Sequence, residues 1–187
     1  DAGLGAGSNG RQHPFYLARE NGALQAIRFM VDADKNPIKD SEGPVSLNGH
    51  SIFRVRYGNA VSYFLRLPDG GTGAGFAGTG FQSLKRLASG DIGAMYAVDG
   101  STSYQGWKDL VDTVQHIVSF ERGTAALAQI NIADLDTATN SHDHADHLAT
   151  ARLALDAVKD MSCVNRAYYV DYASAKLPPN LNAQDRD

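Results

Sequence analysis

The hydrophobic positions along the chain follow two spacings, one typical of helices and one typical of strands. Apolar residues recur at helical spacing in 14–30, 103–120 and 145–161, and these segments are predicted to be helices. A shorter helix is expected over 83–88. The apolar stripe of 103–120 consists of Trp107, Leu110, Val111, Val114, Ile117 and Val118. Such a stripe is typical of a helix that buries one face against a core.

Segments rich in β-branched, aromatic or apolar residues lie between these helices and predict strands. The predicted strands are 51–57, 61–67, 94–98, 125–132 and 167–172. Gly58-Asn59 separates the first two and indicates a tight hairpin turn. The polar segment 33–44 contains Pro37 and Gly43 and is expected to be a loop. The glycine-dense segment 68–80 directly follows a predicted strand, so we expect a functional loop there.

The order of these elements favours an α/β fold. Strands alternate with helices after the hairpin, which predicts a mostly parallel sheet covered on both faces, with the hairpin as an antiparallel edge. Ligands bind at the carboxyl ends of the strands in such sheets. The glycine-rich loop after Leu67, Asp99 after Val98, and a histidine cluster beyond Ile132 all follow predicted strands. We therefore expect these segments at one edge of the sheet.

Composition narrows the classes of function. The 187 residues suit a single domain with a real core, and the net charge of −4 without a basic, aromatic-rich run argues against nucleic acid as a partner. No apolar stretch is long enough to span a bilayer. Cys163 is the one cysteine, which excludes an internal disulfide and a multi-thiolate metal site but leaves the cellular compartment open.

The most informative segment is 142–147, which holds three histidines and two aspartates just before a predicted helix. Imidazole and carboxylate are ligands that zinc prefers. A metal-bound water beside an acid/base residue is a common arrangement for hydrolysis near neutral pH. The cluster therefore indicates metal-dependent hydrolysis, and two family resemblances compete to explain it.

Read from His142, the cluster is His-x-His-x-Asp-His and resembles the metallo-β-lactamase signature. That superfamily builds a two-metal site and needs more histidines downstream. No histidine follows His147, and Leu148-Ala149-Thr150 stands where a glycine pair usually follows the signature. A binuclear hydrolase is therefore the weaker of the two interpretations.

Read from His144, the cluster is His-x-Asp-His leading into a helix, and it resembles the C-terminal motif of the PIG-L/LmbE family of zinc-dependent N-deacetylases. Other short motifs resemble the larger-protein branch of that family in the same order along the chain. They are Asp1-Ala2-Gly3, Arg19-Glu20, Phe64 to Gly71, Val98 to Ser101, Tyr168 to Tyr172 and Leu177 to Leu181. The resemblance spans nearly the whole chain, and only the histidine cluster is chemically specific.

The resemblance also has one departure. The family's His-Pro-Asp-Asp motif supplies two metal ligands and the general base, and by this alignment it lies upstream of Asp1. His13-Pro14 is no substitute, because Phe15 and Tyr16 follow it. We therefore expect residues 1–187 to form one deacetylase-like domain that lacks the family's first strand and helix. Either these residues are a fragment of a longer protein, or this copy lacks a full metal site.

The resemblance implies a role for each residue of the cluster. His147 is the expected metal ligand, and His144 is the expected acid that protonates the leaving amine or stabilises the oxyanion. Asp146 is expected to accept a hydrogen bond from an imidazole and fix its tautomer, although a first-turn aspartate also suits the helix dipole. His142 and Asp143 are assigned to a loop, with Asp143 as a possible helix cap.

Two residues outside the cluster are candidates for substrate binding. Arg19 could clamp a sugar hydroxyl or an anionic group, or pair with an acid at the surface. Asp69 could bind sugar hydroxyls, or serve as a turn residue before glycines. The glycines of 70–80 lack the Lys-Ser/Thr of a phosphate-binding Walker loop, so this loop is expected to be a mobile rim.

Taken together, the resemblance implies a Rossmann-like three-layer α/β fold that removes an N-acetyl group from an amino-sugar conjugate with a zinc-type ion. The alternative from another class is a non-catalytic carbohydrate-binding domain of the same fold. Catalytic zinc normally takes three protein ligands, so His147 alone would not hold it tightly. Metal content separates the three interpretations: one ion, none, or two per chain.

Overall fold

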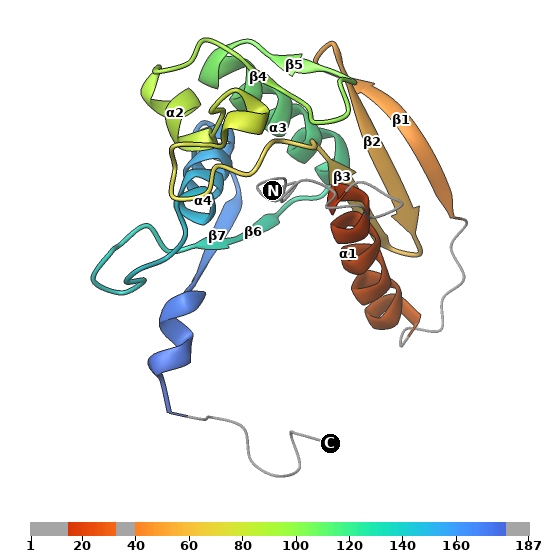
Figure 1. Cartoon of the computed structure of the whole chain (residues 1–187). Coiled ribbons are helices and arrows are strands. Elements are labelled where there is room, and N and C mark those ends of the chain that lie inside the picture. Colours follow the sequence, from red (N-terminus) through yellow and green to blue (C-terminus); the bar gives the residue numbers. More distant parts are fainter. Residues whose placement is uncertain (1–14, 33–39, 179–187) are drawn as a thin grey trace.

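The computed structural model describes residues 15–32 and 40–178, and this part of the chain is a mixed α/β structure (Figure 1). The motif Asp1-Ala2-Gly3, the dipeptide His13-Pro14 and the end of the motif at 177–181 lie outside the described residues. No helix in the described ranges is both long and apolar enough to cross a membrane.

The first sheet is antiparallel and contains β1 (Ser41–Leu47), β2 (His50–Tyr57) and β3 (Ala60–Phe64), in that order. The predicted hairpin turn at Gly58-Asn59 is confirmed, because β2 and β3 pair directly across it. The predicted loop over 33–44 is wrong at its end, where β1 begins. Its polar sequence is tolerated because β1 is an edge strand, and Pro44 needs no ladder partner for a missing N–H there.

Four α-helices are described: α1 (Phe15–Asp32), α2 (Leu84–Ser89), α3 (Gly106–Arg122) and α4 (Ala145–Val158). Two of them, α2 and α4, begin with a side-chain cap. The Ser83 side chain caps α2 by accepting the N–H of Arg86. The predicted helix over 103–120 begins later than expected, because Gly106 has a φ of 80°, which a right-handed helix does not continue through. Ser103–Tyr104 instead forms β5, which pairs with β4 (Met95–Tyr96).

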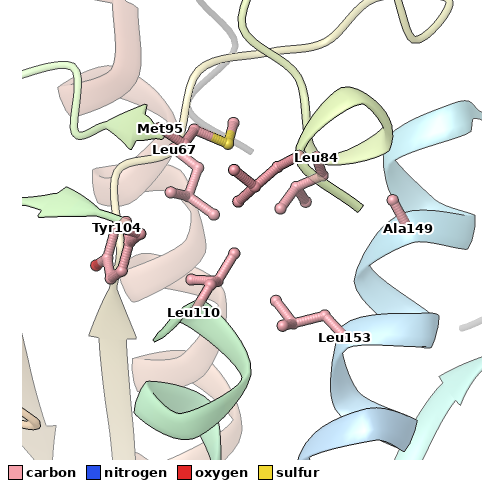
Figure 2. Packing of buried hydrophobic residues seen from close by; sticks show 8 residues of the cluster. Leu67, Leu84, Met95, Tyr104, Leu110, Ala149 and Leu153 are labelled. Carbon is pink, nitrogen blue, oxygen red and sulfur yellow. The ribbon is translucent and has the colours of Figure 1, made fainter. Parts of the chain in front are cut away.

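The core lies where α2, α3 and α4 meet the ends of the strands. Its buried side chains are Leu67, Leu84, Leu87, Met95, Tyr104, Leu110, Ala149 and Leu153. Figure 2 shows side chains from α2, α3 and α4 converging on Leu67 and Met95. Burial raises the pKa of the Tyr104 hydroxyl, whose ring packs on His50. This core fixes α4, and α4 carries the histidine cluster.

The second part of the fold is the parallel pair β6 (Ala128–Ala133) and β7 (Val164–Tyr169), with α4 packed on β6. Among the described residues, β6 and β7 are the one parallel pair of strands. The β1–β3 and β4–β5 sheets are antiparallel. The predicted mostly parallel sheet with two covered faces is therefore not confirmed. The prediction of a buried strand at 125–132 is also wrong in part, because Gln129 and Asn131 are exposed.

Arg66 joins α1 to the rest of the fold. Its guanidinium donates to the Glu20 carboxylate at 2.8 and 3.0 Å and to Asp99 at 2.5 Å, and it lies over the Phe53 ring. Burial works against the charge of Asp99, but hydrogen bonds from Ser101 and Arg66 hold the pKa of this carboxyl below its usual value. Asp99 is thus a structural ion-pair partner in this fold.

Asp109 connects α3 to the β1–β2 hairpin and gives a prediction of pH-dependent stability. Its carboxylate accepts the Gln105 N–H at 2.7 Å and contacts the buried His50 ring at 3.0 Å. Burial raises its pKa, but these hydrogen bonds outweigh burial and lower the pKa below the ordinary value. We expect Asp109→Asn to reduce the free energy of unfolding by about 2 kcal/mol near pH 7.

The sign of the pH dependence follows from the lowered pKa. The stabilisation by Asp109 is fully present above the unfolded pKa of about 3.9 and is lost as pH falls through the folded pKa. Urea unfolding of both proteins from pH 3 to 7 should therefore show a difference that shrinks at low pH. Asp112→Asn, which breaks an exposed pair with Lys108, is the control and should cost less than about 0.5 kcal/mol. A difference that stays constant with pH would contradict this role.

Candidate metal-binding site

The histidine cluster forms the first turn of α4, with His144 as its N-cap. The Nδ1 atom of His144 accepts the backbone N–H of Asp146 at 3.2 Å. The backbone N–H of His144 in turn donates to Asp143 Oδ1 at 2.7 Å. His142, just before, has a φ of 64° in the left-handed region, which turns the chain into the helix. These two hydrogen bonds thus fix the His144 ring relative to the start of α4.

His147 lies between two carboxylates. Its Nδ1 atom is 2.8 Å from Asp143 Oδ1 and 3.1 Å from Asp171 Oδ2. Its ring also packs against the rings of His144 and Tyr172, with centroids 5.4 and 5.5 Å away. Asp171 follows β7, and β7 runs parallel to β6. The segments that follow the two strands therefore both lie near the start of α4. The imidazole is thereby held from two separate segments.

Asp143 is the buried member of this group. Its side chain is fully inaccessible, and its Oδ2 accepts the side-chain amide of the buried Asn140 at 2.6 Å. Asn140 also donates to the carbonyl of Asp134 and accepts the N–H of Asp171. Burial raises the pKa of Asp143, but hydrogen bonds from His147, Asn140 and the His144 N–H outweigh it and lower the pKa below its usual value. The carboxylate is therefore held in its charged form, as a metal ligand requires.

Asp143, His147 and Asp171 could hold a metal ion together. One donor atom from each lies within 4.8 Å of the others. Donors of a tetrahedral zinc site, with bonds of 2.0–2.1 Å, lie about 3.3 Å apart. The two distances from His147 Nδ1, 2.8 and 3.1 Å, are a few tenths of an ångström shorter. An ion at this place would replace the proton on Nδ1, and two carboxylates and one imidazole are donors that a zinc-type ion accepts.

The same contacts allow a second mode of ligation. A histidine that donates its Nδ1–H to a carboxylate presents Nε2 to a metal, and the carboxylate fixes the tautomer. Asp143 would then orient the ring without touching the ion. The two modes make different demands on Asp171, which is a ligand in the first and a weak neighbour in the second.

Asp146 does not take the role expected from sequence. Its Oδ2 accepts the backbone N–H of Gly70 at 2.7 Å, and its contact with His144 is through its backbone N–H. The side chain is 1% exposed, and Oδ1 has no hydrogen-bond partner among the described residues. Burial is the main reason that the pKa of this carboxyl is raised. The prediction that it accepts a hydrogen bond from an imidazole is therefore wrong: it anchors the glycine-rich loop to α4.

The two predicted substrate-binding residues lie in different places. Asp69 accepts the N–H of Gly71 at 2.7 Å, as a turn residue does, and Gly70 beside it contacts Asp146. Asp69 thus comes near the start of α4. Arg19, on α1, lies over the Phe15 ring and lines a cavity of about 490 Å³ between α1, β3 and α4. Among the described residues, no hydrogen bond or ion pair joins Arg19 to the histidine cluster.

Sequence reasoning missed Asp171 as a partner of His147, and it assigned Asp143 only to a loop or cap. The rule that ligands gather at the carboxyl ends of strands could have found Asp171, because it follows the last predicted strand closely. Asp143 does cap the chain before α4, and it also holds His147.

No protein-family model, no curated protein and no solved structure matches this chain. The function must therefore be argued from the site itself.

Proposed function

We propose that this chain belongs to a zinc-dependent amide hydrolase that removes an N-acetyl group from an amino-sugar conjugate. The observation that carries the proposal is the position of His147 at the start of α4. Its imidazole lies between Asp143 and Asp171, and the His144 ring packs beside it. These groups would form a metal ligand set beside a hydrogen-bond donor. The resemblance to the PIG-L/LmbE family supports the choice of an N-acetyl amide.

A zinc-type ion bound there would polarise the amide carbonyl and lower the pKa of its bound water toward about 7. His147 would hold the ion, and Asp143 would fix the imidazole and keep its charge balance. The resemblance assigns the base for the water's proton to the His-Pro-Asp-Asp motif, and residues 1–187 do not contain that motif.

His144 suits the role of hydrogen-bond donor to the substrate. Because its Nδ1 accepts the N–H of Asp146, the neutral ring carries its proton on Nε2. That N–H can stabilise the oxyanion that develops on the acetyl oxygen. A proton on Nδ1 would break the bond to Asp146, so the fold favours the tautomer with its proton on Nε2.

A Rossmann-like three-layer arrangement belongs to the same proposal. It is supported by the parallel pairing of β6 and β7, by α4 packed on β6, and by the position of the site beyond the carboxyl ends of these strands.

The proposal is tested by metal content and acetate release measured on one preparation. The protein is loaded with zinc, desalted, and assayed by plasma mass spectrometry and with an N-acetylglucosamine conjugate. About one zinc per chain together with acetate release supports the deacetylase. Two ions per chain would favour a binuclear hydrolase. Sugar binding without metal would favour a carbohydrate-binding domain.

Asp171→Asn separates the two modes of ligation. If Asp171 is a direct ligand, we expect its zinc affinity to fall about 100-fold, because an amide is a much poorer ligand than a carboxylate. Calorimetric zinc titration measures this change. Asp112→Asn removes the same charge from an exposed helical pair and should leave affinity within twofold. An unchanged affinity in Asp171→Asn would assign the ion to Nε2 of His147.

A further inference from the structure

The outer edge of β6, defined by the backbone of Gln129, Asn131 and Ala133, is open among the described residues. The N–H of Ala128 donates to Cys163 O at 3.0 Å, and that of Asp134 donates to Tyr169 O at 2.8 Å, so both point to β7. Backbone groups alternate sides along a strand. The backbone groups of 129, 131 and 133 therefore point to the other edge, where no described strand pairs with β6.

A two-stranded parallel sheet is an incomplete unit. Parallel sheets are normally buried and several strands wide, and two strands alone are marginal in water. β7 itself exposes Tyr168 and Tyr169, at 51% and 55%. An extended segment on the outer edge of β6 would satisfy the open backbone groups and widen the sheet.

The side chains around this edge define the pattern of such a segment. Ile132 is buried on one face of β6, while Gln129 and Asn131 are exposed on the other and hydrogen-bond to each other at 3.0 Å. The helix α4, which packs on β6, also walls the 490 Å³ cavity through Leu153 and Ala154. A strand beside β6 should therefore be apolar toward α4 and polar on its other face.

Charged side chains at the two ends of this edge favour one direction for a segment that pairs with β6. The Arg122 guanidinium binds the carbonyls of Ala126 and Ser162 just before β6 and β7. Asp134 and Asp136 follow β6 directly. A segment that runs parallel to β6 is matched by an acidic residue at its start and a basic residue at its end.

We propose that the outer edge of β6 is an interaction surface for an extended strand of alternating apolar and polar residues, paired in parallel, with an acidic first and a basic last residue. This is β-augmentation, in which main-chain hydrogen bonds supply affinity and alternate side chains supply specificity. The proposal does not depend on the proposed deacetylase function.

The test uses the full chain and an eight-residue peptide of alternating valine and threonine, with glutamate first and arginine last. Amide exchange by NMR is the readout. In the free chain, the N–H groups of 129, 131 and 133 should exchange at least tenfold faster than those of 128, 130 and 132. The peptide should protect the first set. A peptide with the two charges exchanged should bind at least tenfold more weakly.

Matched variants test the surface from the protein side. Asn131→Pro removes an outward N–H and leaves the β6–β7 ladder intact, whereas Asn131→Ala keeps that N–H. We expect peptide affinity at least tenfold lower in Asn131→Pro than in Asn131→Ala, with equal thermal midpoints. Equal affinities would overturn the proposal. So would outward amides already protected without peptide, either in a monomer, where the chain covers its own edge, or in a dimer, where a second copy does.

Discussion

His147→Ala is expected to abolish metal binding and, with it, hydrolysis. The imidazole contacts both carboxylates of the site, so its removal leaves Asp143 and Asp171 without the group that joins them. Loss of even an outer partner of a metal ligand typically costs 10–100-fold in affinity. We therefore expect zinc affinity to fall by on the order of 100-fold or more, measured by competition with a chelating dye.

His144→Ala is the matched comparison, because the two rings are neighbours with different roles. His144 caps α4 and offers Nε2–H, and no hydrogen bond joins its ring to a carboxylate among the described residues. We expect bound zinc to stay near one per chain, while kcat falls about 100-fold because the Nε2–H that would stabilise the oxyanion is lost. His116→Ala, on the exposed face of α3, should change neither quantity. Full activity in both active-site variants would refute the assigned roles, as would loss of zinc in His144→Ala alone.

Gly70→Ala is expected to destabilise the fold strongly. A Cβ at this position would lie 2.5 Å from Asp146 Oδ1 and 2.6 Å from Ser83 Cβ, and both neighbours are buried. Relief of this clash must push the loop away from α4 and break the 2.7 Å bond from Gly70 N–H to Asp146. We expect a loss of about 3 kcal/mol in the free energy of unfolding, from overpacking and an unpaired buried carboxyl.

Gly78→Ala is the control on the same loop, because its added Cβ meets nothing within 4 Å. Its unfolding free energy should stay within about 0.5 kcal/mol of the wild type. Urea denaturation of the three proteins gives the comparison. If Gly70→Ala proved as stable as Gly78→Ala, the close packing of the glycine-rich loop on α4 would be disproved.

Periodicity predicted the helices well where an apolar stripe faces a core. The stripe through Leu110 packs into the core as expected, and the helix predicted over 145–161 forms as α4. Strands were harder to predict, because β1 and β7 expose many residues and so lack a clear apolar pattern. The start of α3 depended on the φ of Gly106, which composition does not specify.

The site shows the same division. His144 and His147 were singled out by the resemblance of their motif, and the structure places both rings together at the start of α4. The contact between His147 and Asp171 spans 24 residues and depends on the parallel pairing of β6 with β7. The contact of Asp146 with Gly70 spans 76 residues and depends on how a glycine loop packs. Neither distance follows from local sequence, so both partners had to be seen in space.

The 76-residue separation between Gly70 and Asp146 also bears on how the chain folds. The hairpins of β1–β3 and the pairing of α3 with α4 close short loops and can form early, whereas closing a long loop carries a larger entropic cost. The anchor of the glycine-rich loop is therefore expected to form late, after its neighbours are in place. A chain still emerging from the ribosome would hold its first hairpins well before it could hold a metal ion.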